Sequence, residues 1–224
     1  MKRVTLFAGH YGSGKTNIAL NYARRLKRSG ESVAVGDLDI VNPYFRSKDS
    51  AAELAAQGIA LVVSDYANSN VDFPAMPKEL YALVADRSRK VVLDIGGDDR
   101  GALALGRYVP DLKAENDYDM LGVINASRPL TRTPADTLEV LREIEAACGL
   151  AFTGLVNNTN LGSATRAEDV LKSRDYAEGV SALTGLPVRL TCCSRALAPE
   201  LEGRVENLFV LDIQRLYYQV EAMA

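Results

Sequence analysis

Short runs of consecutive apolar residues alternate along this chain with longer stretches in which apolar residues recur every three or four positions. The short runs predict buried strands, and the longer stretches predict helices with one buried face. Because the two kinds of segment alternate throughout, the pattern predicts an α/β fold with a doubly wound, mainly parallel sheet. Strands are expected at 4–8, 32–36, 59–63, 91–94, 121–125, 152–156 and 188–193, and helices at 51–58, 77–85 and roughly 208–222.

Two more helices carry start signals in the sequence. Thr133 is followed by Pro134 and by Asp136 in the first turn, which is typical of a capped helix. Thr165 and Glu168 have the spacing of a capping box, so they predict the start of the next helix.

Composition indicates one globular domain that covers residues 1–224. Hydrophobic residues make up 47% and charged residues 25% of the chain, and a net charge of −3 favours neither nucleic acid nor an anionic membrane as a partner. No apolar run is long enough to span a bilayer and no signal peptide opens the sequence, so we expect a cytoplasmic protein. The segment 208–222 is not basic, and we therefore expect it to pack on the core or on a partner subunit.

The most specific motif follows the first expected strand. It fits the phosphate-binding pattern G-x-x-x-x-G-K-[ST] at every fixed position, between a strand and a helix. Glycines let the backbone turn its N–H groups toward phosphate oxygens, Lys15 is expected to reach the β- and γ-phosphates, and the Thr16 hydroxyl is expected to bind Mg²⁺. The expected nucleotide-binding residues of this loop are Gly9, His10, Tyr11, Gly12, Ser13, Gly14, Lys15 and Thr16.

A second motif ends the strand at 91–94. Its last residue, Asp94, has the Walker B pattern, in which a carboxylate at the end of an apolar strand helps to hold Mg²⁺. Gly97 follows at a D-x-x-G spacing, which allows its N–H to contact a γ-phosphate. A loop that contacts the γ-phosphate acts as a conformational switch.

Polar residues also follow two other expected strands. Asp37 and Asp39 follow the strand at 32–36, where α/β sheets bind ligands, and one of these carboxylates is expected to orient a water or to hold Mg²⁺. The alternative is a pair of solvated loop acids. Asn157 follows the strand at 152–156, and its amide either reads a purine edge or belongs to a simple turn.

The cysteines indicate no metal centre. Cys148, Cys192 and Cys193 form no C-x-x-C pair, so buried small side chains are the favoured interpretation, and a metal or redox site shared between subunits is the alternative. His10 is the single histidine, which excludes a mononuclear His-rich metal site. The segment 64–77 is either a binding surface or a connection.

Taken in order, the phosphate loop, Asp37 to Asp39, the Asp94 strand and Asn157 resemble the MinD/ParA/CobQ-type P-loop ATPases of the SIMIBI class. This branch includes the nitrogenase iron protein, whose switch II segment is similar to residues 94–98. The resemblance covers nearly the whole chain and implies the P-loop NTPase fold. It also implies a homodimer that encloses two ATP molecules and changes its partner affinity on hydrolysis.

The resemblance assigns roles by position. Lys15 and Asp39 are the implied catalytic residues, Asp39 being similar to the switch I aspartate that orients the attacking water. Thr16, Asp39 and Asp94 are the implied Mg²⁺ ligands. Asn157 is similar to the asparagine that reads adenine.

One position departs from the pattern of that family. Its phosphate loop begins K-G-G, and the first lysine crosses the dimer to the partner's ATP, whereas this chain has His10 and Tyr11 there. Neutral imidazole does not supply the permanent charge of lysine. Either His10 takes part of that role, or another cation such as Arg46 or Arg100 does, or hydrolysis is slow. The family's bridging cysteines are also missing, which weakens an iron–sulfur or zinc assignment.

The sequence therefore predicts a Mg²⁺- and ATP-binding molecular switch with slow hydrolysis that forms a nucleotide-dependent homodimer and acts on a protein partner or cargo. One alternative is an ATP-dependent enzyme that acts on a small molecule, as dethiobiotin and cobyrinate amide synthetases do. Another is a nucleotide-gated adaptor without turnover. GTP is less favoured, because no N-K-x-D base-reading motif is present.

Overall fold

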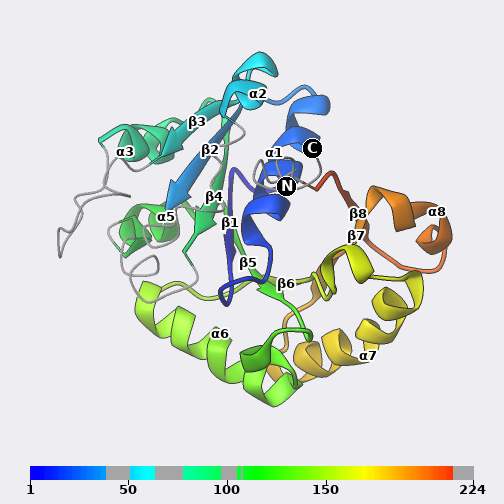
Figure 1. The fold of residues 1–224 in the computed structure, drawn as a ribbon. Coiled ribbons are helices and arrows are strands. Elements are labelled where there is room, and N and C mark those ends of the chain that lie inside the picture. Colours follow the sequence, from blue (N-terminus) through cyan, green and yellow to red (C-terminus); the bar gives the residue numbers. More distant parts are fainter. Residues whose placement is uncertain (39–50, 64–77, 97–104, 107, 214–224) are drawn as a thin grey trace, which may run out of the picture.

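The computed structural model describes residues 1–38, 51–63, 78–96, 105–106 and 108–213. These residues form an eight-stranded sheet in the order β3-β2-β4-β1-β5-β6-β7-β8, and every neighbouring pair of strands is parallel. Helices alternate with the strands along the chain (Figure 1). The predicted α/β fold with a doubly wound, mainly parallel sheet is confirmed.

The strands and helices lie close to their expected positions, except near the C-terminus. The strands are β1 (Val4–Ala8), β2 (Val33–Leu38), β3 (Ala60–Val63), β4 (Lys90–Ile95), β5 (Tyr118–Ile124), β6 (Gly154–Asn157), β7 (Val188–Ser194) and β8 (Leu208–Leu211). The α-helices are α1 (Lys15–Arg28), α2 (Ala51–Ala56), α3 (Lys78–Ala85), α5 (Val109–Glu115), α6 (Pro134–Cys148), α7 (Ala167–Thr184) and α8 (Ala198–Leu201). Short 3-10 helices are η3 (Pro129–Thr131), η4 (Gly162–Ala164) and η5 (Arg195–Leu197).

The core covers both faces of the sheet, because successive residues of a buried strand point to opposite sides. In β1, Leu6 and Ala8 pack into the cluster beneath α3, α5, α6 and α7, whereas Phe7 packs into the cluster beneath α1. Figure 1 shows α1 apart from α6 and α7, which lie side by side. None of the helices in the described ranges combines the length and apolar character needed to cross a membrane.

The strand order reverses around β1. The chain fills one half of the sheet with β2, β3 and β4, and then passes to the other side of β1 with β5 to β8. Such a reversal leaves a crevice at the carboxyl ends of the central strands, which is where α/β proteins bind ligands. The phosphate loop follows β1 and therefore lies at this crevice.

The helix predicted at 208–222 is wrong at its start, because residues 208–211 form β8. Phe209 and Leu211 pack on the α1 side, while Leu208 and Val210 pack on the opposite cluster. A strand buried on both faces has a continuous apolar run, which periodicity alone does not distinguish from a buried helix. Residues 214–224 lie outside the described part of the chain.

The two predicted helix starts have different outcomes. The Thr133 cap is confirmed, since its hydroxyl accepts the Asp136 N–H at 3.2 Å. The capping box at Thr165 is wrong by one residue, because the backbone N–H that is capped belongs to Arg166, which donates to the carboxylate of Asp169 at 2.9 Å. The Thr165 hydroxyl instead closes the preceding turn.

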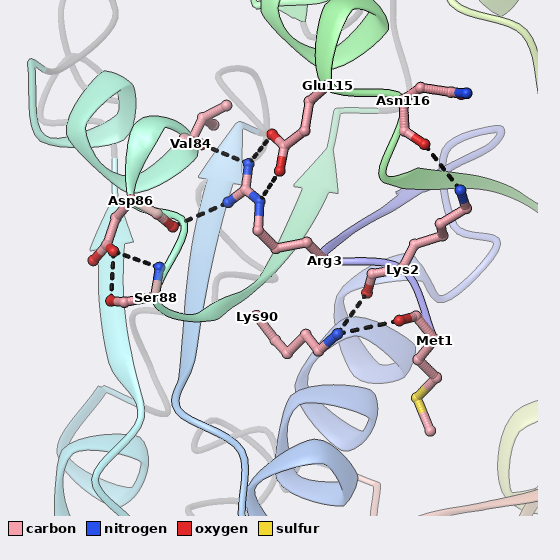
Figure 2. Close-up of polar contacts among 9 residues, drawn as sticks. All are labelled: Met1, Lys2, Arg3, Val84, Asp86, Ser88, Lys90, Glu115 and Asn116. Carbon is pink, nitrogen blue, oxygen red and sulfur yellow. Dashed lines mark hydrogen bonds and ion pairs between the residues drawn. The ribbon is translucent and has the colours of Figure 1, made fainter.

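A buried arginine ties the amino end of β1 to two helices (Figure 2). The Arg3 guanidinium pairs with both carboxylate oxygens of Glu115 at the end of α5, and it also donates to the carbonyl oxygens of Val84 and Asp86, at 2.8 and 3.1 Å. These hydrogen bonds from Arg3 hold the pKa of Glu115 below its ordinary value of 4.5, although partial burial opposes them. The ion pair therefore stabilises the fold wherever the carboxyl is ionised.

We expect Glu115→Gln to lower the free energy of unfolding by about 2 kcal/mol at pH 7, because it leaves the buried Arg3 charge without its carboxylate. Since the folded-state pKa of Glu115 is depressed, this contribution is present above pH 4.5 and is lost as the pH falls through the lowered pKa. Urea unfolding of wild type and variant at pH 7 and near pH 3 measures both effects. Glu178→Gln is the control, because Glu178 is exposed and lies 4.0 Å from Arg174. A wild-type advantage that stays equal at both pH values would contradict the assignment.

Candidate nucleotide-binding site

Three glycines shape the loop between β1 and α1. Gly9, Gly12 and Gly14 have φ angles of +155°, +73° and +94°, which other residues rarely adopt. A Cβ atom on Gly9 would lie 2.4 Å from the carbonyl oxygen of Val123 in β5. The loop is therefore packed so closely on the central strands that glycine is required there.

Side chains bind the carbonyl oxygens of this loop. The Lys15 ammonium donates to the carbonyl of His10 at 3.2 Å, and Nε of Arg128 donates to the carbonyl of Gly12 at 2.8 Å. These contacts hold the loop backbone in one shape. In a glycine-rich loop of this kind, successive N–H groups form a concavity that binds anions.

A third contact comes from the residue that follows β6. The side-chain amide of Asn158 donates to the carbonyl of Ser13 at 2.6 Å. A Cβ atom on Gly14 would lie 2.3 Å from that amide nitrogen, so Asn158 and the loop fit together only because residue 14 is glycine. The loop thus depends on contacts with β5, β6 and α1 together.

Helix α1 begins at this loop, and its charged residues leave the amino end free of negative charge. No acidic residue lies in its first turn, whereas Arg25, Lys27 and Arg28 lie in its last turn. The first hydrogen bond of the helix runs from the Ile18 N–H to the Gly14 carbonyl, so the preceding N–H groups point out of the helix end. The helix dipole and these groups together favour a bound anion.

The loop is joined to two carboxylates at the ends of neighbouring strands. The Thr16 hydroxyl donates to the Asp94 carboxylate at 2.5 Å, and Asp94 of β4 lies directly beside Asp37 of β2 in the sheet register. Both acids are buried on the α1 face, because each follows by two residues a valine that packs against α1. Oxygen ligands of this kind suit Mg²⁺.

The residues present fit a metal held jointly with phosphate better than a metal held by protein alone. Within the described ranges, no group of three or more His, Cys, Asp or Glu side chains could hold a metal ion. Mg²⁺ characteristically uses one or two carboxylates, waters and the phosphates of its substrate. Thr16, Asp37 and Asp94 would supply the protein oxygen ligands of such a metal, and the glycine loop would hold the phosphates that supply the others.

A cavity of about 430 Å³ opens beside the phosphate loop, within the size range of small-ligand sites. It is lined by the loop and the start of α1, by residues that follow β6, and by residues at the ends of β7 and β8. Among the described residues that line it there is no carboxylate side chain. The lining residues are Tyr11, Gly12, Gly14, Lys15, Thr16, Asn17, Arg128, Asn158, Thr159, Asn160, Gly162, Thr165, Val170, Cys192, Cys193, Ser194, Leu211 and Ile213.

Asn157, which the sequence analysis assigned to the purine, does not lie in this cavity. Its side chain is buried against α7, where the amide donates to the Ser173 hydroxyl at 2.8 Å and its oxygen accepts the Thr159 N–H at 3.2 Å. The alternation of β6 explains the placement, because Val156 faces α1 and Asn157 therefore faces α7. Asn17, Asn158 and Asn160 are the asparagines among the described residues that line the cavity.

The two adjacent cysteines of β7 point to opposite faces of the sheet. Cys192 packs with α1, and Cys193 packs with α7 and α8. Burial raises the pKa of both thiols, and all three cysteines of the chain are free. Neighbours on one strand cannot both ligate the same metal from opposite faces, so buried small side chains remain the better interpretation.

Several predicted site residues cannot be placed, because Asp39, Gly97, Arg46, Arg100 and the segment 64–77 lie outside the described residues. His10 lies in the loop, and its Nδ1 is 2.9 Å from the Tyr11 carbonyl, which makes Nδ1–H the donor. Tyr11 is 52% exposed at the tip of the loop.

Sequence reasoning missed two contributions to the site and left a third undecided. Asp37 and Asp39 were both candidates, and the register that places Asp37 beside Asp94 is seen only in the structure. The alternation of side chains along β6 would have selected Asn158 over Asn157. Arg128 had no sequence signal, because its contact with Gly12 joins positions 116 residues apart.

Comparisons with known proteins agree with this architecture. No family profile and no curated protein matches the chain by sequence. Among solved structures, the cell division protein FtsY from Thermotoga maritima is 17% identical with a TM-score of 0.60, over 85% of this chain and 61% of that chain. Chloroplast FtsY from Physcomitrella patens is 17% identical with a TM-score of 0.59, over 85% of this chain and 58% of that one.

A third similar structure is the signal recognition particle 54 kDa protein from Aeropyrum pernix in complex with GDP. It is 18% identical with a TM-score of 0.53, and the match covers 85% of this chain and 41% of that protein. The chain thus spans about three-fifths or less of the length of these neighbours. At such identities the likeness establishes the fold alone. The fold is the α/β fold of P-loop NTPases, and membership of the MinD/ParA branch stays a prediction.

We expect Gly9→Ala to destabilise the protein by about 2–4 kcal/mol, because the added methyl group meets a backbone oxygen of β5 and the φ angle is unfavourable. Gly30→Ala is the matched control, since Gly30 also has a positive φ of +90° but no atom lies within 4 Å of its Cβ position. It should cost only the backbone strain, about 1 kcal/mol. Denaturant unfolding measures both values. Equal losses for the two variants would show that the loop is not packed against β5 as described.

Proposed function

We propose that this chain is a cytoplasmic molecular switch that binds Mg²⁺ and ATP and hydrolyses ATP slowly. The observation that carries the proposal is the phosphate loop, whose carbonyls are bound by Lys15, Arg128 and Asn158 while Thr16 contacts the Asp94 carboxylate. An anion-binding concavity joined to a metal-binding carboxylate suits a Mg²⁺-bound polyphosphate.

In the proposed complex, Lys15 binds the β- and γ-phosphates. Thr16, Asp94 and Asp37 hold Mg²⁺, directly or through water, and the bound metal neutralises phosphate charge. Asp39 orients the attacking water, a role that rests on the family resemblance. The loop N–H groups stabilise the charge on the transferring phosphoryl group.

The chemistry of the cavity favours adenine over guanine. Guanine presents two neighbouring N–H donors, which a carboxylate recognises, and no carboxylate lines the described part of the cavity. Adenine presents one donor beside one acceptor, which an asparagine amide matches. Asn158 and Asn160 supply such amides, so we assign ATP, although the Aeropyrum pernix neighbour was solved with GDP.

We further propose that ATP promotes a homodimer and that hydrolysis releases it, as the resemblance implies. Gly97 contacts the γ-phosphate and transmits its loss to the loop that follows β4. Tyr11 and Leu161, which are 52% and 56% exposed, lie within or next to segments that border the cavity. A second subunit that covers the cavity would bury these two side chains, which supports a dimer at this face.

We expect Asp39→Ala protein to have twice the monomer mass by light scattering with Mg²⁺ and ATP, and the monomer mass with Mg²⁺ and ADP. The substitution removes the residue that orients water, so the ATP state persists during the measurement. The matched control is the same variant with Lys15→Ala added, which should remain monomeric with either nucleotide. An unchanged mass in the two nucleotide states would contradict the proposed switch.

A further inference from the structure

Arg128 contacts the phosphate loop from the segment that follows β5. Its Nε donates to the Gly12 carbonyl at 2.8 Å. The Cβ position of Gly12 is 3.6 to 4.0 Å from Nε, Cδ and Cζ of Arg128, so the guanidinium lies directly over this part of the loop. Arg128 also lines the nucleotide cavity, together with Lys15 and Thr16.

The turn that carries Arg128 is held by hydrogen bonds within the chain. Asn125 at its start is fully buried and accepts the Ser127 N–H at 2.9 Å through its side-chain oxygen. The Asn125 carbonyl also accepts the Thr131 hydroxyl at 2.7 Å and the Arg128 N–H at 3.2 Å. A side chain on such a turn loses little further freedom when it binds a ligand.

The charge of Arg128 is not balanced by a nearby acid in the described part of the chain. No ion pair among the described residues includes Arg128, and no described carboxylate lines the cavity. The contact with Gly12 uses only Nε, so the two Nη groups of the planar guanidinium can serve another acceptor. A guanidinium binds phosphate in a bidentate manner and is always charged.

We propose that Arg128 is a second phosphate-binding cation of the site, whose Nη groups bind phosphoryl oxygens of the bound nucleotide opposite Lys15. The inference rests on the proposed function, because it deepens the account of the same site. Arg128 supplies a permanent positive charge from within the same subunit. The loop that it contacts has His10 where the resembled family has a lysine. The Nε contact with Gly12 couples phosphate binding to the shape of the loop.

The test compares ligand affinities of wild type, Arg128→Gln, Arg128→Lys and Arg132→Gln by calorimetry. Arg132 is the matched control, because it lies four residues further along, is exposed and does not line the cavity. We expect Arg128→Gln to weaken Mg²⁺ and ATP binding about 10- to 100-fold and Arg128→Lys to weaken it less. Adenosine, which has no phosphate, should bind all four proteins within about twofold.

Two results would overturn the proposal. One is an ATP affinity of Arg128→Gln within about twofold of wild type. The other is an equal loss of ATP and adenosine affinity, which would indicate damage to the loop rather than loss of a phosphate ligand. Thermal unfolding without ligand checks that each variant is folded. If Arg128→Gln is not folded, the affinities of Arg128→Lys for ATP and adenosine are compared with those of wild type instead.

A second probe, inorganic tripolyphosphate, separates this proposal from the proposed function. If wild type binds no nucleotide but is stabilised by tripolyphosphate and Arg128→Gln is not, then ATP binding is wrong and the role of Arg128 stands. If wild type binds neither ATP nor tripolyphosphate, both proposals are overturned.

Discussion

The site depends on one constraint, which is that side chains bound to its carbonyl groups hold the backbone of the phosphate loop in one shape. Glycines make the conformation possible, but contacts from other parts of the chain maintain it: Lys15 of α1, Arg128 after β5 and Asn158 after β6 each bind a loop carbonyl. Because these residues belong to different elements, the loop takes this shape only when the central strands are assembled. The site is therefore a property of the whole sheet.

The parallel sheet also determines where the acids lie. Asp37 and Asp94 come from strands whose carboxyl ends are in register, and the reversal of strand order at β1 places the phosphate loop beside them. The Thr16 hydroxyl joins the start of α1 to Asp94. The segment in which the sequence predicts a switch follows β4.

Local patterns predicted most of the fold. The phosphate-loop motif and the Asp94 motif are each contiguous in sequence, and the strands β1 and β4 and the helix α1 that flank them lie where they were expected. The C-terminal strand was missed because burial on both faces removes the periodicity that separates strands from helices. To predict the contact of Asn158 with the loop, one must know which face of the sheet each residue at the end of β6 points to. The contact of Arg128 joins distant positions, and no local pattern encodes it.

The most direct test of the central claim, that this loop binds Mg²⁺ and a nucleoside triphosphate, is a calorimetric titration of wild type and Lys15→Ala with ATP and Mg²⁺. The account predicts one site per chain, weaker binding when Mg²⁺ is chelated, and a loss of about 100-fold in Lys15→Ala but not in Lys27→Ala, which changes the last turn of the same helix. Wild-type protein that binds no nucleoside triphosphate, or Lys15→Ala protein that binds as tightly as wild type, would contradict it.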